Sequence, residues 1–162
     1  MAKDIRSLAQ KLVGAGTDIG EALHAATRGG HRGVMNDLLE NGASIAAKDA
    51  HSAYTPLHHA TDRGETKVVQ LLLLKGADKD VLNNDGWTPL YLAALWGHAA
   101  AARALMTAGA DISLRCGHSR GAVMHTAAQK GLVAVLRAVI ERGADVNAVD
   151  TGVKTPLHLA AD

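Results

Sequence analysis

A six-residue phrase occurs five times in this chain at nearly equal intervals. The copies begin at Glu21, Thr55, Thr88, Ala122 and Thr155, so each step is 33 or 34 residues. A fixed period of this size is typical of repeat architectures, in which small units bury apolar surface only against their neighbours. The 162 residues therefore predict a row of stacked units rather than one ordinary globular core.

The repeated phrase has the features of a helix start. Each of the three prolines, Pro56, Pro89 and Pro156, directly follows a threonine. A threonine hydroxyl can accept a hydrogen bond from the first helical turn, and proline at the first helical position loses no helical hydrogen bond. The first and fourth copies have Glu21 and Ala122 in place of threonine, so we expect these two helices to be less firmly capped.

Two regularly placed glycines follow each of the first four copies, one nine residues after the start and the other twelve residues later. They are Gly30 and Gly42, Gly64 and Gly76, Gly97 and Gly109, and Gly131 and Gly143. Glycine can end a helix in the left-handed conformation, and the apolar stretches between the glycines predict a buried second helix. The length of the segment before the next start varies by one residue, which places insertions in one loop per unit. Turn residues at 83–86 and 150–152 predict a hairpin in that loop.

These features, together with Gly-Ala-Asp-Val-Asn-Ala at 143–148, resemble ankyrin repeats. The resemblance implies an all-α repeat fold, a solenoid of stacked helix-turn-helix units with projecting β-hairpin loops. It covers residues 18–162, as four full repeats starting near Glu21, Thr55, Thr88 and Ala122 and a truncated fifth at Thr155. Residues 1–17 are then expected to form an N-terminal capping helix, a half repeat. Because the fifth unit stops after one helix, either the sequence is a piece of a longer protein, which we favour, or this half repeat serves as a cap.

Composition narrows the class of partner and the compartment. The formal net charge is +1, so no overall field draws the chain to nucleic acid or anionic lipid. The single cysteine, Cys116, cannot form an internal disulfide, which favours the cytoplasm, with the nucleus as the alternative. Charges interrupt the opening residues, and no apolar run approaches a membrane-spanning length. We expect a soluble monomer that binds neither nucleic acid nor membrane.

The histidines and the cysteine are the candidates for metal or redox chemistry. Four histidines occupy the fourth position of the phrase and two follow a helix-ending glycine: His24, His58, His125, His158, His31 and His98. The resemblance implies hydrogen bonds to backbone and neighbouring repeats for them. Cys116, His118 and His125 form a cluster too thin for zinc, so we expect no metal and no cofactor. Cys116, beside Arg115, is either a redox-sensitive thiol of lowered pKa or an unreactive, partly buried one.

Aromatic residues give the clearest indication of a binding surface. The chain has no phenylalanine, and its whole aromatic inventory is Tyr54, Trp87, Tyr91 and Trp96. The resemblance places these side chains on the concave groove formed by the hairpins and inner helices, where large aromatic groups anchor partners. For Trp87, packing on the neighbouring hairpin is an equal alternative. The candidate partner-binding residues are Tyr54, Asp62, Arg63, Asn83, Asp85, Trp87, Leu95, Trp96, Gln129, Lys130 and Lys154.

Three functions remain open at this point. The leading hypothesis is a non-catalytic scaffold that binds a protein or peptide on its concave surface, since no nucleophile comes with an evident base. An alternative is a regulatory or targeting arm of a larger enzyme or channel. A third, implied by the resemblance, is that Asn147 is a substrate of an asparaginyl hydroxylase, and only this repeat has asparagine at the matching position, where the others have Ala46, Asp80 and Ser113.

Overall fold

The computed structural model describes residues 18–117 and 121–161, and within them the chain forms nine helices. The predicted capping helix at 1–17, and His118 with Arg120, lie outside the described residues. The helices are α2 (Ile19–Arg28), α3 (Arg32–Glu40), α4 (Pro56–Asp62), α5 (Thr66–Leu74), α6 (Pro89–Leu95), α7 (Ala99–Thr107), α8 (Val123–Gln129), α9 (Val133–Glu141) and α10 (Pro156–Ala161).

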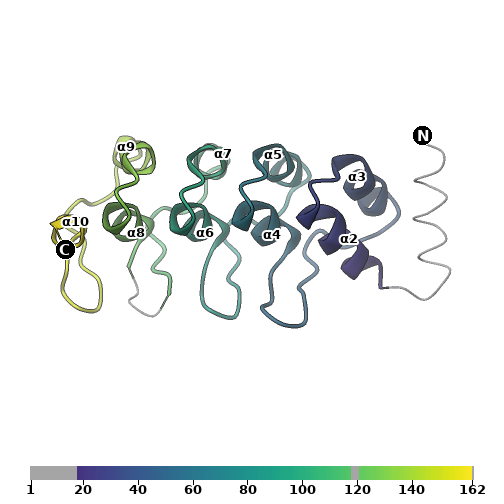
Figure 1. The fold of residues 1–162 in the computed structure, drawn as a ribbon, viewed down its shortest axis with the longest axis horizontal. Coiled ribbons are helices and arrows are strands. Elements are labelled where there is room, and N and C mark those ends of the chain that lie inside the picture. Colours follow the sequence, from purple (N-terminus) through teal and green to yellow (C-terminus); the bar gives the residue numbers. More distant parts are fainter. Residues whose placement is uncertain (1–17, 118–120, 162) are drawn as a thin grey trace.

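The helices form two rows, as Figure 1 shows. In the inner row α2, α4, α6, α8 and α10 pack side by side, and in the outer row α5 packs on α7 and α7 on α9. Each outer helix also packs on the inner helix that precedes it. The loops that join each outer helix to the next inner helix, here called the first to fourth fingers, project from the inner row on the side away from the outer helices (Figure 1). They are residues 41–55, 75–88, 108–122, of which 118–120 lie outside the described residues, and 142–155. The predicted all-α stack of helix pairs is therefore confirmed.

The helix starts follow the predicted capping chemistry except at the first unit. Thr55 and Thr88 each accept a hydrogen bond from the backbone N–H three residues ahead. Ala122 has no side-chain cap, as expected. The first helix is better capped than expected, because it begins before Glu21 and the carboxylate of Asp18 accepts from the backbone N–H of Gly20 at 2.8 Å.

The glycine after α4 is needed for both its backbone conformation and the space that it leaves. Gly64 has a φ of 70°, in the left-handed region that side chains disfavour. A Cβ atom there would lie 2.6 Å from Nδ1 of His98, whose Nε2 is 3.0 Å from the carbonyl oxygen of Asp62. This glycine lets one repeat close against the histidine of the next.

The core is aliphatic and lies between the two rows. Leu57, Leu72, Leu90 and Leu105 are fully buried, and small alanines fill the remaining space. Leu157 of α10 is 78% exposed, because no outer helix packs behind α10 within the described residues. The buried leucines couple each repeat to its neighbours.

The fingers are closed by short side chains rather than by β ladders. The described residues contain no strand, only an isolated antiparallel bridge between Cys116 and Gly121. Asp49, Asn83 and Asp150 occupy equivalent positions, and each accepts hydrogen bonds from the backbone of its own turn. Cys116 takes this position in the third finger. Neighbouring fingers are also joined, since the backbone N–H of Asn84 donates to Ser52 and that of Gly117 to Gly86.

Candidate functional site

The four aromatic side chains differ in how far they reach solvent. Trp96 is the C-terminal cap of α6 and is 56% exposed. Trp87, Tyr91 and Tyr54 are only half-exposed or less. Trp96 is thus the aromatic side chain that the fold leaves most available to a partner.

Trp87 packs between the second and third fingers. Its ring centroid lies 5.9 Å from that of Tyr91, and a Cβ atom on Gly117 would lie 3.1 Å from Nε1 of Trp87 and 3.2 Å from the hydroxyl of Tyr91. The indole Nε1 is buried and finds no hydrogen-bond partner among the described residues. This geometry favours the packing alternative for Trp87, with the bare backbone of Gly117 lying on the two rings.

Tyr54 packs on the histidines of the same repeat. Its ring centroid lies 5.3 Å from that of His58 and 5.1 Å from that of His59. Burial, together with the carboxylates of Asp62 and Asp85, raises the pKa of Tyr54 to about 12. The hydroxyl therefore stays protonated at neutral pH and can donate a hydrogen bond.

Two rows of candidate residues run along the C-terminal ends of the inner helices. Arg63, Trp96 and Lys130 are the C-terminal caps of α4, α6 and α8, which pack side by side. All three are exposed, and neither cation makes an ion pair within the described part of the chain. Trp96 consequently has a positive charge on each side. We call Arg63, Trp96 and Lys130 the Trp96 row.

The residues just before these caps form the second row. Asp62 and Leu95 are partly buried, whereas Gln129 is exposed. They lie at matching positions of α4, α6 and α8. The structure thus brings together one apolar side chain, one carboxylate and one amide beside the Trp96 row.

The finger candidates divide into buried and exposed residues. Asn83 is 7% exposed, and its Oδ1 accepts from the backbone N–H groups of Asp85 and Trp87 at 3.0 and 2.8 Å. Asp85 and Lys154 are exposed. Asn83 holds the shape of its finger, and only the other two present side chains to solvent.

Most of the repeated histidines have the structural contacts expected for them. His58 accepts at Nδ1 from the backbone N–H of Thr55, and its Nε2 lies 3.1 Å from the carbonyl oxygen of Trp87 in the next finger. His125 makes the same pair of contacts with Ala122 and Ala148. Burial lowers the pKa of His58 to about 4, so the ring is neutral at pH 7.

His24 departs from this pattern. It is buried, yet neither ring nitrogen has a hydrogen-bond partner among the described residues, so the expected hydrogen bonds are wrong for this histidine. Its ring instead meets the edge of His59 at a centroid distance of 5.1 Å. Nε2 of His59 lies 2.8 Å from Oδ2 of Asp49, at ion-pair distance but without the alignment of a hydrogen bond. Burial lowers the pKa of both histidines.

Cys116 does not have the surroundings of a reactive thiol. The side chain is 0% exposed, and its sulfur lies 3.8 Å from the hydroxyl of Thr88. Burial raises the pKa of the Cys116 thiol, so the alternative of a lowered pKa is wrong. No group of three or more His, Cys, Asp or Glu side chains within residues 18–117 and 121–161 is placed to hold a metal ion.

Comparison with known families matches nearly the whole chain. A model described as ankyrin repeats (3 copies) matches residues 2–83 and 23–116, and a single ankyrin repeat model matches 123–151. The chain belongs to the ankyrin repeat family. Ankyrin repeats indicate protein–protein interaction. Among the described helices, none combines the length and the apolar character that a membrane span requires.

Three curated relatives illustrate where ankyrin repeats like these occur. The chain is 34% identical over 138 residues to ankyrin repeat and SOCS box protein 16 of Homo sapiens, covering 85% of this chain and 30% of that protein. It is 30% identical over 141 residues to a transient receptor potential cation channel subfamily A member 1 homolog of Caenorhabditis elegans, covering 87% and 12%. It is 37% identical over 90 residues to protein phosphatase 1 regulatory subunit 12A of Mus musculus, covering 54% and 9%. The chain therefore spans less than a third of each of these three relatives.

One surface of this ankyrin stack was not found from the sequence. An apolar groove lies between the outer helices α5 and α7, and its side chains include Leu74, which is 84% exposed. The signal was present in the sequence as a leucine at the register position where α7 has Thr107 and α9 has Glu141. It was missed because the apolar run at 68–73 was interpreted as core alone.

Proposed function

We propose that this ankyrin stack is a non-catalytic scaffold that binds an exposed segment of another protein on the Trp96 row. The observation that supports the proposal is an indole 56% exposed at the end of a buried helix. A tryptophan buries a large area on binding and loses little side-chain entropy, which is why such residues dominate interface energies.

The charges around the indole indicate the chemistry of the bound segment. Arg63 and Lys130 flank Trp96 along the row of inner helices, and both are exposed. A segment with one apolar side chain and a carboxylate on either side complements this arrangement. Leu95 and Gln129 add apolar and amide contacts beside it. Asp85 and Lys154 would contact the same partner from the fingers.

We expect little cost in ordering the receptor. Tyr54, Trp87 and Asn83 are held by contacts within and between fingers, so in our proposal they shape the surface rather than provide its main contacts. A preformed surface loses less conformational entropy when a partner binds. The protein is proposed to act as a cytoplasmic or nuclear monomer.

The experiment is affinity capture from a native lysate with wild type, Trp96→Ala, Trp87→Ala and the double variant Arg63→Glu/Lys130→Glu. Proteins recovered by the wild type should be lost with Trp96→Ala and with the charge variant, while both keep the wild-type melting temperature. Trp87→Ala should instead lower the melting temperature, because its ring packs under Gly117. Equal recovery by wild type and Trp96→Ala would contradict the proposal.

A second candidate is an arm of a larger enzyme or channel. The relatives include a protein phosphatase regulatory subunit and a cation channel, and the chain covers 9% and 12% of these two proteins. Sequencing the coding region beyond Asp162 tests this alternative. A new domain there supports it, and a stop codon or further repeats alone contradict it.

A third candidate is modification of Asn147. Its side chain is exposed in the loop after α9, and its backbone N–H donates to Oδ1 of Asp145 at 2.9 Å. Treatment with an asparaginyl hydroxylase should add one oxygen to the peptide that contains Asn147. An unchanged mass of this peptide after treatment would contradict the candidate.

A further inference from the structure

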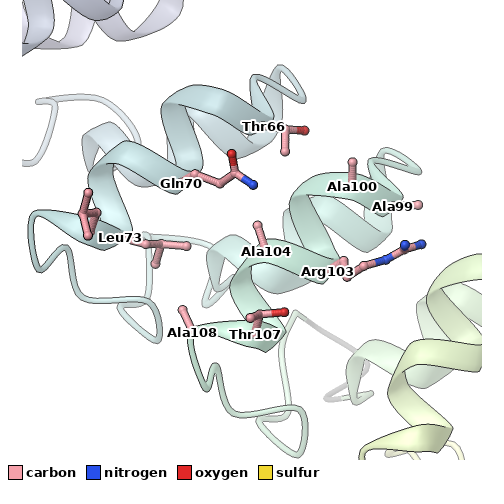
Figure 2. A pocket seen from close by; sticks show the side chains of 10 residues that line it. Thr66, Gln70, Leu73, Ala99, Ala100, Arg103, Ala104, Thr107 and Ala108 are labelled. Carbon is pink, nitrogen blue, oxygen red and sulfur yellow. The ribbon is translucent and has the colours of Figure 1, made fainter.

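A groove with a volume of about 790 Å³ lies on the surface between α5 and α7, two adjacent helices of the outer row (Figure 2). On one wall lie Gln70, Leu73 and Leu74 of α5, and on the other lie small side chains of α7 together with Arg103. Figure 2 shows Gln70 reaching from α5 toward α7. This surface belongs to the outer helices, whereas the Trp96 row belongs to the inner ones.

The apolar wall of the groove includes a leucine, Leu74, that the fold does not require. Leu74 is 84% exposed, and the residues at the matching positions of α3, α7 and α9 are Glu40, Thr107 and Glu141. The other outer helices are thus polar where α5 carries a leucine. An isolated exposed leucine is ordinary, but one that lines a groove of this size provides a contact for an apolar side chain.

The charged side chain that lines the groove is a cation, Arg103. Helices α5 and α7 carry Lys67 and Arg103 and no carboxylate, although the whole chain has nearly equal numbers of acidic and basic residues. Arg103 extends from α7 toward α9, where Arg137 occupies the matching position (Figure 2). Arg103 and Arg137 line a second hollow of about 350 Å³ between α7 and α9, whose other charged lining residues are Arg142 and Glu141, so cations outnumber carboxylates there by three to one. Neither Arg103 nor Arg137 makes an ion pair within the described part of the chain.

The backbone around the groove favours a helical occupant. Between their first and last turns, the N–H and C=O groups of α5 and α7 are bonded along their own helices, so the sides of these helices offer no edge for pairing with an extended strand. Ala100, Ala104 and Ala108 leave little side chain between the groove and a helix laid along it, which permits close approach. A helix satisfies its own backbone and needs only side-chain contacts.

We propose that the groove between α5 and α7 docks an acidic amphipathic α-helix of a partner protein. Leucine-like side chains spaced three and four residues apart enter the groove between Leu73 and Ala104, and carboxylates on the flank of the helix pair with Arg103 and Arg137. This docking is separate from binding at the Trp96 row, so the stack holds two partners or two segments of one partner at the same time.

The test is selection of helical peptides from a phage-displayed library on the full chain. The library consists of peptides of about four helical turns on an alanine scaffold, randomised along one face and its flanks. Selected sequences should carry leucine-like residues at helical spacing and an excess of Asp and Glu beside them. Selection of sequences without carboxylates, or no enrichment over background, overturns the proposal.

Variants of the chain then test whether the selected peptide binds in the groove. Fluorescence anisotropy should show binding about tenfold or more weaker for Leu74→Ser and for Arg103→Glu, with added salt weakening wild-type binding as well. Both residues are exposed, and circular dichroism confirms folding of each variant. Arg137→Glu serves as an independent charge variant, and Leu82→Ser, at an exposed leucine outside the groove, is the matched control that keeps the wild-type affinity. Unchanged affinity in Leu74→Ser and Arg103→Glu, or loss with Leu82→Ser, overturns the proposal.

Discussion

At the scale of single residues, the last finger contains an unfavourable backbone conformation. Val153 has a φ of 60° and is 73% exposed, and Gly86 holds the equivalent position in the second finger. The left-handed region costs a residue with a Cβ atom roughly 1–2 kcal/mol. Val153→Gly should therefore raise the free energy of unfolding by about 1 kcal/mol, measured by urea denaturation. Val149→Gly, at a position without positive φ, is the control and should give no increase.

A second residue-scale prediction concerns pH and the buried ring of His58. Its pKa is about 4 in the folded chain against 6.5 in the unfolded chain. Above pH 6.5 neither state binds the proton, and the full stability is present. As the pH falls from 6.5 toward 4, only the unfolded chain binds it, so the free energy of unfolding should decrease by on the order of 3 kcal/mol.

Replacing His58 isolates this contribution. Urea denaturation across pH 4 to pH 7 should give a shallower slope for His58→Gln than for the wild type. His24 and His59, whose pKa values burial also lowers, maintain part of the slope in that variant. The exposed His158, at the same position in the last repeat, provides the matched control as His158→Gln. An identical slope in wild type and His58→Gln would refute the assignment.

At the scale of one helix, α8 lacks the cap that α4 and α6 have. Ala122 offers no side-chain acceptor, and it borders a hollow of about 370 Å³ that leaves room for a larger side chain. Ala122→Thr should stabilise the protein by about 0.5–1 kcal/mol, and Thr88→Ala should cost a similar amount. Hydrogen exchange resolved by residue should show the gain in α8. A gain spread evenly over all helices would argue against capping as its cause.

At the scale of the whole molecule, the stability of each repeat depends on its packing against neighbouring repeats. The helices α3 and α5 make few contacts, whereas α5 with α7 and α7 with α9 pack along the outer row. Leu38→Ala, in α3, should cost about 2–5 kcal/mol and unfold the first repeat before the rest. Because Trp87 lies directly before the third unit and Trp96 lies within it, circular dichroism should then report an earlier transition than tryptophan fluorescence.

Leu105→Ala provides the comparison with Leu38→Ala. Leu105 is fully buried in α7, which is the next helix along the chain after Trp96. In Leu105→Ala, the midpoint of the tryptophan fluorescence transition should shift to a lower urea concentration, by an amount that matches the loss of stability. Coincident circular dichroism and fluorescence transitions in Leu38→Ala would show that the stack unfolds as one unit.

The sequence predicted the regular part of this molecule better than its exceptions. The period, the helix pairs and the threonine caps follow from local chemistry, which one sequence displays. The cap from Asp18 was missed because the repeated phrase begins only at Glu21, and the unpartnered ring of His24 depends on burial against the next repeat. The packing of Trp87 on Gly117 and the α5–α7 groove depend on how adjacent repeats meet, which no single repeat encodes.

The side-by-side packing of α4, α6 and α8 sets the spacing of the partner residues that can contact the Trp96 row. Helices packed in this way lie about 8–10 Å apart, so Arg63, Trp96 and Lys130 contact points on the partner that are separated by that distance. An extended segment advances about 3.3 Å per residue and a helix about 1.5 Å. The carboxylates of a matching extended segment must therefore stand about three positions before and after its apolar residue, and those of a helical one about six.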